Sequence, residues 1–456
     1  MAATPAPAAP ATAAPLADVA PRLAAVLAQP GGLTSGDAGR RASETSVQAK
    51  IEHGDVRAAE ETKEQVIWNA APRLTLTGRA QRYSSVDPFI IVDPVTMERS
   101  SLTQPNRTYY LNAGLTVPIS DYLLRLVQTL RGASTNRDAA LLEERAARVT
   151  SSANGRVAYY DWVQSELQTI VAEQALSQAS AQLARMQALY SVGRAAQADL
   201  LQAQAFEADA QLTLSQGQTQ QSVAVERLRT TIHAPLDEKL TIGEDVLAEF
   251  PAKEEARSVE ELYREALAQR LEIKALERSH SALEDSRYIE SSHALPTLEA
   301  IGNVTYANPN QRIFPLQPQW DATWDVALQL TWTINDVGAS SSRASSLDAQ
   351  ISQLDQRKVG VEEQLRLEVV TAYGALNQAR QNVVTAQTGE RAAGAAYAAR
   401  VQLQEQGMGT TLELIQAETA RINARLNLIN AHIALRVARA QLDHAVGRDI
   451  PLEPAR

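Results

Sequence analysis

Two very long stretches of the chain contain no proline: residues 119–234 and residues 319–450. Proline ends a helix because it lacks a backbone N–H and its ring collides with the preceding turn, so a helix can continue through most of each stretch. A helix from Asp121 to about Tyr190 would be roughly 100 Å long, at about 1.5 Å per residue. No single globular domain needs a helix of that length. The chain must therefore fold into an elongated structure.

Each stretch contains one glycine-bearing segment at which a long helix can reverse. The first reads YSVGRAAQADLLQAQ over residues 190–204, and the second reads QEQGMGTTLELIQAE over residues 404–418. Glycine, an acidic residue, leucine and glutamine recur in register between them at an offset of 214 residues. We therefore expect two long helical hairpins, over residues 121–232 and residues 336–446, that are copies of one another.

A strand-like phrase precedes each long helix. Residues 113–121 read AGLTVPISD and residues 328–336 read LQLTWTIND. Both phrases belong to segments in which apolar and polar residues alternate with a period of two, which is the pattern of a β-strand with two different faces. We expect two strand pairs, within residues 72–119 and residues 296–334, each followed by a helical hairpin.

One side of these strands is apolar enough to face lipid. Each segment has about the 9–11 residues that a tilted strand needs to cross a bilayer. The residues expected to face lipid are Tyr109, Leu111, Leu115, Val117, Trp324, Val326, Leu328, Leu330 and Trp332. The polar residues between them would face the lumen of a barrel. Four strands are too few to close a barrel, and an open edge in lipid leaves backbone groups without hydrogen bonds, so several copies must pool their strands.

Composition excludes several classes of function. The net charge is −10 and no basic residues cluster, which argues against a nucleic-acid partner. The chain has no cysteine, and its six histidines show no metal-ligand spacing. The motifs of serine hydrolases, nucleotide-binding loops and zinc proteases are absent as well. We expect neither an enzyme nor a bound metal or cofactor.

The sequence also lacks two kinds of membrane-targeting segment. No run of 18 apolar residues occurs, so we expect no transmembrane helix. The opening MAATPAPAAPATAAPLADVAP has neither a basic region nor a continuous apolar region, so it is not a secretory signal in this numbering.

The patterns divide the chain into five parts. They are a flexible Ala/Pro-rich arm at 1–31, a first repeat at 32–234, a linker at 235–257, a second repeat at 258–447 and a tail at 448–456. Each repeat begins with a charged helix, continues with a strand pair and ends with a long hairpin.

The ordered set of repeated phrases resembles the TolC family of outer-membrane efflux proteins. The likeness runs from about residue 40 to 450, through AAPRLTLTG and ALPTLEAIG, LTVPISD and LTWTIND, and the endings LRTTIHAPL and LDHAVGRDIPL. It implies an α+β fold in which three chains form a twelve-stranded transmembrane β-barrel, continuous with a twelve-helix tunnel through the periplasm. The linker and both termini would form a belt around that tunnel.

The resemblance also implies a function. Such proteins are passive exit ducts in the outer membrane for tripartite efflux or type I secretion systems. A periplasmic adaptor protein docks on the tips of the hairpins and links the duct to an inner-membrane transporter.

The resemblance places functional residues at the two helix reversals. Glu413 and Gln416 fall where some family members carry two aspartates that narrow the periplasmic mouth. Asp199 falls at a family position whose residue pairs with an arginine and so keeps the mouth closed. The position of that arginine is occupied by Gly409 in this chain. The tips implied for adaptor docking are Val192, Gly193, Arg194, Gly407, Met408 and Gly409. The alternatives are an ordinary solvated helix face for Glu413, and glycines that only permit a tight reversal.

Two other functions remain open at this point. One is a structural coiled-coil scaffold, which would require the alternating segments not to be strands. The other is a periplasmic adaptor, which also has a long helical hairpin. An adaptor has one hairpin between β-domains, whereas this chain has two hairpins that each follow a strand pair. The duplication therefore favours the duct.

Overall fold

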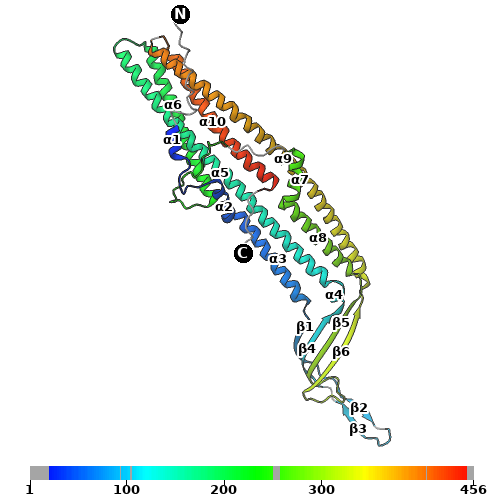
Figure 1. The fold of residues 1–456 in the computed structure, drawn as a ribbon. Helices are drawn as coiled ribbons and strands as arrows, with labels where there is room; N and C mark the ends of the chain where they lie inside the picture. Colours follow the sequence, from blue (N-terminus) through cyan, green and yellow to red (C-terminus); the bar gives the residue numbers. More distant parts are fainter. Residues whose placement is uncertain (1–19, 93, 103–104, 250–256, 407, 449–456) are drawn as a thin grey trace. The chain divides into compact units, whose positions relative to one another are not determined.

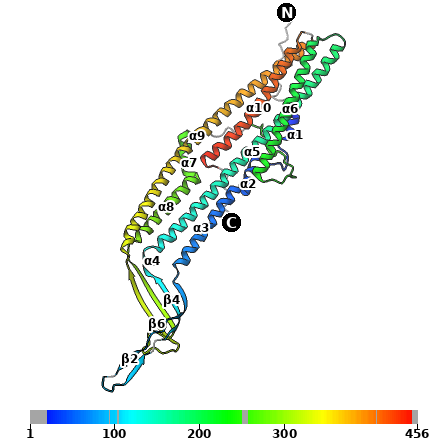
Figure 2. The ribbon, with the colours of Figure 1, turned by 180° about the vertical axis from the view of Figure 1, so that it is seen from behind.

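The computed structural model describes residues 20–92, 94–102, 105–249, 257–406 and 408–448. Figure 1 shows its ribbon, and Figure 2 shows the same ribbon from behind. The chain forms two compact units, each built from segments that are far apart in the sequence. Unit 1 comprises residues 1–54, 141–274 and 359–456, and unit 2 comprises residues 55–140 and 275–358.

Unit 2 contains a four-stranded antiparallel sheet with the strand order β1-β4-β5-β6. Its strands are β1 (Arg73–Arg82), β4 (Arg107–Pro118), β5 (Thr297–Asn308) and β6 (Asp321–Thr331). Both expected strand pairs are present, and the pairing of β4 with β5 joins the first repeat to the second. Strands β1 and β6 stand at the two edges, so each has a strand partner on one side only.

The connector between β1 and β4 contains a feature that the sequence pattern did not predict. Strands β2 (Phe89–Val92) and β3 (Arg99–Leu102) form a separate antiparallel ribbon. Each of these strands has four residues, which is too short for an alternating pattern to stand out, and prolines flank the first one.

A buried arginine fastens the corner at which β4 becomes helix. Arg125 separates α4 (Ile119–Leu124) from the long helix that follows, and its side chain pairs with Asp121 at 2.7 Å. The same guanidinium donates to the hydroxyl and the backbone carbonyl of Ser292, at 2.8 Å and 2.9 Å. These contacts satisfy a guanidinium that is only 7% exposed, and they fix the direction in which the helix leaves the sheet.

The helices follow the expected plan of two long hairpins. The first comprises α5 (Leu126–Ser191) and α6 (Gln197–Ile232), and the second comprises α9 (Ile334–Glu405) and α10 (Thr411–Val446). The remaining helices are α1 (Ala20–Val26), α2 (Ser35–Thr45), α3 (Val47–Ala70), α7 (Val259–Gln269) and α8 (Leu271–Ser292). Across the described ranges, no helix combines the length and the apolar character that a membrane crossing requires.

In unit 1, helix α10 packs into two hydrophobic cores at once. The residues it contributes to the first core, with α5 and α6, are Leu428, Ile429 and Ile433. Those it contributes to the second core, with α7 and α9, are Ala431, Leu435, Ala438, Leu442, Ala445 and Val446. The matching stripe of α9 advances in steps of four and three residues, as a coiled-coil seam does: Leu365, Val369, Ala372, Leu376, Ala379 and Val383. Helix α10 therefore has neighbouring helices on two of its sides.

Helices α6 and α9 are covered along one stripe only. The buried residues of α6 are Ala203, Ala210, Leu214, Ala224, Leu228 and Ile232. Its exposed Leu201, Leu212 and Val223 follow one another at intervals of eleven residues, which is about three helical turns, so they share a face. The exposed apolar residues of α9 in unit 1 are Val359, Leu367, Val370 and Val384. Each of these helices therefore keeps an uncovered, partly apolar face.

The segment that follows α6 is held against α10 by Arg436, which is 9% exposed. This side chain forms an ion pair with Glu244 at 2.9 Å. It also donates to the backbone carbonyls of Asp245, Val246 and Ala248, at 2.8 Å, 2.9 Å and 3.3 Å. The segment lies in the expected linker 235–257, of which residues 250–256 are outside the described ranges.

Part of the expected arm is helical. Residues 1–19 and 449–456 are outside the described ranges. Within the expected arm, residues 20–26 form helix α1, and Leu23 is 2% exposed in the first core. Pro21 stands in the first turn of α1, where a proline is compatible with a helix, so the proline-rich composition did not prevent one.

Candidate functional site

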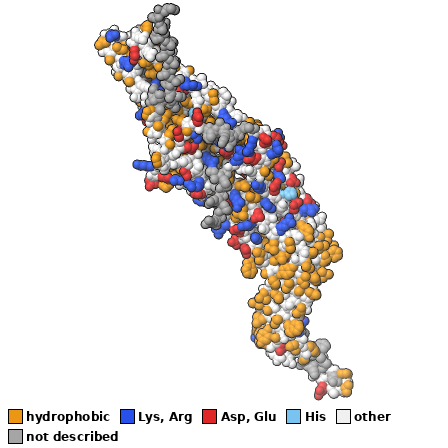
Figure 3. Space-filling model, in the orientation of Figure 1, with side chains coloured by type: hydrophobic (Ala, Val, Ile, Leu, Met, Phe, Trp, Pro, Cys, Tyr) orange, Lys and Arg blue, Asp and Glu red, His pale blue; other side chains and the backbone are white. Residues whose placement is uncertain are grey.

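One face of the sheet is apolar along its length, and we call it the apolar face. It consists of the even-numbered residues of β1, β5 and β6 and the odd-numbered residues of β4, which the register places beside one another. Eight of the nine residues expected to face lipid share it: Tyr109, Leu111, Leu115, Val117, Trp324, Val326, Leu328 and Leu330. Figure 3 shows hydrophobic side chains gathered over these strands.

Aromatic residues stand at both ends of the apolar face. The ninth expected residue, Trp332, lies one position beyond β6, and its ring N–H donates to the carbonyl of Ala294 at 3.2 Å. At the opposite end, where the connectors are, Trp320 stacks on Tyr306 with ring centres 4.9 Å apart. The ring of Tyr109 lies 6.0 Å from that of Trp320.

The other face of the sheet carries a ladder of polar side chains. Thr305 donates to the amide oxygen of Asn112 at 3.1 Å, and the amide of Asn112 lies 3.5 Å from Asn303. Asn303 in turn donates to the carboxylate of Asp325 at 3.1 Å. A side chain at Gly114 would place its Cβ 3.0 Å from the amide oxygen of Asn303, so glycine leaves the space for this ladder. Such a face suits contact with water rather than with lipid.

The first hairpin turn is closed by backbone hydrogen bonds. Gly193 adopts a left-handed φ of +74°, which glycine reaches without strain. The N–H groups of Gly193 and Arg194 donate to the carbonyls of Tyr190 and Leu189, at 3.0 Å and 2.8 Å, which is a common way to end a helix. Val192, next to the glycine, is 66% exposed. The turn thus presents an apolar side chain to its surroundings.

The second hairpin turn has a similar composition. Met408 is 67% exposed, and its N–H donates to the carbonyl of Leu403 at 2.9 Å. A Cβ at Gly409 would lie 3.1 Å from the backbone nitrogen of Gln404, so glycine permits the close approach. Gly407 lies outside the described residues. In both views the two turns lie at the same end of unit 1 (Figures 1 and 2).

Glu413 caps helix α10 rather than projecting freely. The N–H of Thr410 donates to its carboxylate at 3.2 Å, and the N–H of Glu413 donates to the hydroxyl of Thr410 at 3.3 Å. This reciprocal pair is a capping box. Arg400 of α9 adds an ion pair at 3.3 Å. Glu413 therefore has a structural role, as a helix cap, at the position where a constriction was expected.

The same contacts lower the pKa of Glu413. The N–H of Thr410 is the largest cause, and the positive charge of Arg400 is the next. The carboxylate is therefore ionised at neutral pH. Because its pKa is lower in the folded chain, its contribution to helix capping is present above the ordinary pKa of a glutamate and is lost as the pH falls through the lowered value.

Asp199 occupies the equivalent place in the first hairpin. Its carboxylate accepts a hydrogen bond from the N–H of Ala196 at 3.3 Å, at the start of α6. Within the described residues of this chain, no ion pair joins Asp199 to the second hairpin. Gln416, one turn beyond Glu413, is exposed. The three expected constriction residues therefore lie at the beginnings of the two returning helices, and in the described part of the chain no hydrogen bond or ion pair joins them.

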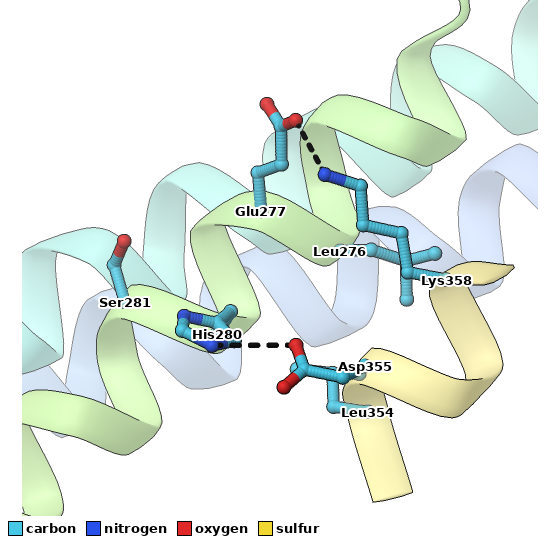
Figure 4. Close-up of a pocket in the computed structure, with 7 residues that line it drawn as sticks. All are labelled: Leu276, Glu277, His280, Ser281, Leu354, Asp355 and Lys358. Carbon is cyan, nitrogen blue, oxygen red and sulfur yellow. Dashed lines mark hydrogen bonds and ion pairs between the residues drawn. The ribbon is translucent and has the colours of Figure 1, made fainter. Parts of the chain in front are cut away.

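A groove of about 300 Å³ between α8 and α9 in unit 2 is shown in Figure 4. Its polar groups pair with one another: Lys358 contacts Glu277 at 2.9 Å, and His280 contacts Asp355 at 3.4 Å. These pairs join α8 to α9. Across the described ranges, no three histidine or carboxylate side chains converge in a way that could bind a metal ion.

One local signal in the sequence would have revealed part of this site. The spacing Thr-x-x-Glu from Thr410 to Glu413 is that of a capping box, which marks the start of a helix. No comparable local signal identifies Arg400 as the partner of Glu413, because that contact forms between the two helices of a hairpin.

Comparisons with known proteins agree with this architecture. A family model described as outer membrane efflux protein matches residues 49–232 and 262–448, one stretch in each repeat. The solved structure of the outer-membrane channel OprN has 18% sequence identity, a TM-score of 0.72 and coverage of 98% of each chain. The CmeC outer membrane channel of Campylobacter jejuni has 15% identity and a TM-score of 0.74, over 91% of this chain and 88% of that chain.

A third solved structure, the open state of the MtrE outer membrane channel of Neisseria gonorrhoeae, has 16% identity and a TM-score of 0.73. It covers 91% of this chain and 88% of that chain. No curated protein sequence matches the chain. At these identities the solved structures establish a shared fold.

The two faces of β6 provide a matched pair of substitutions. We expect Leu328→Arg, on the apolar face, to lower the stability of the protein in lipid vesicles by about 2–4 kcal/mol, because it places a charge in the hydrocarbon. Gln329→Arg, one residue away on the polar face, should be tolerated. Urea unfolding in vesicles measures both. Equal destabilisation by the two substitutions would contradict the assignment of the faces.

Proposed function

Because the chain belongs to the outer membrane efflux protein family, we propose that it is a passive exit duct whose wall is completed by two further copies of itself. One observation carries the proposal: the sheet and the helical hairpins both have two open sides. In the sheet these are the free edges of β1 and β6. In unit 1 they are the uncovered faces of α6 and α9.

The open strand edges are costly in a membrane. Each backbone N–H or C=O without a hydrogen bond in hydrocarbon costs several kcal/mol. Four strands cannot close on themselves, since the smallest membrane barrels have about eight. Three copies supply twelve strands, and pairing β1 of one copy with β6 of the next removes every free edge. The same symmetry brings α6 of one copy against α9 of the next, which covers their exposed apolar residues.

The dimensions of the sheet fit a bilayer. Its four strands have 10 to 12 residues. Trp320 and Trp332, at the two ends of β6, are twelve residues apart, or about 40 Å along a strand that rises ~3.3 Å per residue. A tilt of about 45° reduces this to roughly 28 Å across the membrane, near the ~25 Å apolar band that aromatic girdles flank in outer-membrane barrels. The apolar face is then the lipid-facing surface and the polar ladder lines the lumen.

The other functions considered fit less well. A coiled-coil scaffold needs no strands, whereas the sheet here has four. A periplasmic adaptor has one hairpin, whereas this chain has two. The family is one of efflux channels, and we propose that this chain catalyses no reaction and requires no cofactor. Its partners are outer-membrane lipid, a periplasmic adaptor protein and, through it, an inner-membrane transporter, with no role for nucleic acid.

The assembly is tested by mass and by a substitution on α6. In mild detergent we expect the mass of three chains. Leu212→Glu places a charge on the uncovered face of α6 and should weaken each interface between copies about tenfold, or by ~1.4 kcal/mol, which shifts the equilibrium towards the monomer. Gln211→Glu adds the same charge at an adjacent polar position and serves as the control. A stable monomer with intact sheet, or a trimer unaffected by Leu212→Glu, would contradict this arrangement.

The beginnings of α6 and α10 are the proposed constriction of the duct. Asp199, Glu413 and Gln416 lie near the hairpin turns, where threefold symmetry would bring three copies of each towards one axis. We test Glu413 first, because the hydrogen bond from the N–H of Thr410 and the charge of Arg400 lower the pKa of its carboxyl group. Its pairing with Arg400 at 3.3 Å reduces the negative field at the mouth, so we expect a moderate preference for cations over anions.

Single-channel recording tests the constriction. Glu413→Gln should weaken cation selectivity, while trimer stability changes little because glutamine also serves in a capping box. Gln404→Glu, on the same hairpin, controls for a general change in charge. If Glu413→Gln leaves both selectivity and conductance as they were, the constriction is elsewhere.

The two hairpin turns are the proposed docking site for the adaptor. Each presents an exposed apolar residue beside a glycine, Val192 in one and Met408 in the other, and Gly193, Arg194, Gly407 and Gly409 complete the pair of turns. An exposed apolar side chain on a turn at the end of a helical hairpin is a suitable anchor for a partner protein.

Efflux from cells that lack their own copy of this protein tests the docking site. The double substitution Val192→Asp and Met408→Asp should leave trimer and conductance intact and should abolish efflux of a fluorescent substrate. Leu236→Asp, at an exposed apolar residue outside the turns, should leave efflux unchanged. Normal efflux by the double variant would exclude the turns as anchors.

A further inference from the structure

The apolar face of the sheet carries charge at one place only. Among its positions on the four described strands, the charged residues are Arg82 at the end of β1 and Arg107 at the start of β4. The register pairs these two residues directly with each other. Both side chains are exposed. All other positions on this face hold apolar or uncharged residues, so the two arginines form an isolated basic pair.

The pair has no counter-charge in the described part of the chain. Neither guanidinium forms an ion pair or a hydrogen bond with a described side chain. Like charges directly opposite each other on neighbouring strands destabilise a sheet, since their Cβ atoms are only ~4.5–5.5 Å apart. An anion bound between the two guanidinium groups would remove this repulsion.

The place of the pair along the strand points to the source of that anion. Arg107 is two residues from Tyr109 on the same face, or about 7 Å further along the strand. The rings of Tyr109, Tyr306 and Trp320 lie together at this end of the sheet, and aromatic girdles mark the level of the membrane interface. Arginine side chains extend their charged ends beyond the hydrocarbon, which places both guanidinium groups at the level of the lipid headgroups.

We propose that Arg82 and Arg107 together bind a phosphate group of a phosphorylated glycolipid in the outer leaflet. The connector end of the sheet is the end away from the helices that continue from β4 and β6, and so faces the exterior. Guanidinium groups bind phosphate oxygens through paired hydrogen bonds. Two adjacent guanidinium groups also match the negative charge of one phosphate group. The proposal rests on the proposed function only for the orientation of the sheet in the membrane.

The polar face of the same strand supplies the matched control. Arg79 lies three residues before Arg82 on β1 and pairs with Tyr110 in the register, so it belongs to the opposite face. It is also exposed. Arg79→Gln therefore removes the same charge from the same strand without altering the pair.

Binding of lipid A to the purified full-length protein in mild detergent, followed by native mass spectrometry, tests the proposal. The double substitution Arg82→Gln and Arg107→Gln should weaken binding by at least about tenfold, since it removes two sets of charge-assisted hydrogen bonds. Arg79→Gln should bind as the unaltered protein does. Double substitution to lysine should give an intermediate result, because the charge remains and the paired geometry is lost. If the double glutamine variant does not fold, Arg107→Gln alone takes its place.

Three results would overturn the proposal. The first is unchanged binding of lipid A to the glutamine variants. The second is equal binding of dephosphorylated lipid A, which would mean that the acyl chains alone drive association. The third is displacement of lipid A by an equal concentration of inorganic phosphate, which would mean a site for free anions. Conductance of the same samples in neutral-lipid bilayers reports on the duct separately, so a failure of lipid binding and a failure of the channel are distinguishable.

Discussion

The arrangement of this chain depends on the hydrogen bonds of two strand edges. In water an edge strand is tolerable because water satisfies its backbone N–H and C=O groups. In hydrocarbon no such partner exists. The sheet leaves β1 and β6 open on one side each, so a single copy is incomplete as a membrane structure. Because each strand pair continues into a helical hairpin, the number of copies that closes the sheet also determines the number of helices in the surrounding wall.

Much of the fold could be predicted from the sequence because its strongest patterns are local. A period of two over residues such as Trp324, Val326 and Leu328 predicts a strand and both of its faces without knowledge of the neighbours. Long stretches without proline predict the hairpins in the same way. The pairing of β4 with β5 could not be derived, since it joins segments almost two hundred residues apart. The β2–β3 ribbon and helix α1 were also missed, because their segments are short and rich in proline.

In the candidate site, too, local features could be predicted from the sequence and long-range contacts could not. The positions of Glu413 and Asp199 near the turns follow from the repeat, and the capping box of Thr410 can be read from four consecutive residues. The ion pair with Arg400 could not be predicted, because it depends on how two helices are rotated about their axes. Arg436 was missed for a similar reason: the segment it holds lies 188 to 192 residues earlier in the chain. Contacts of this kind become visible only when tertiary structure is known.

The place of α10 in the chain has a consequence for the packing of unit 1. Helix α10 is the last of the described helices, yet it contributes stripes to both cores of unit 1. A chain that ends before residue 411 lacks three buried residues of the first core and six of the second, so neither core is complete without α10. The packing of unit 1 is therefore completed only by the last part of the second repeat.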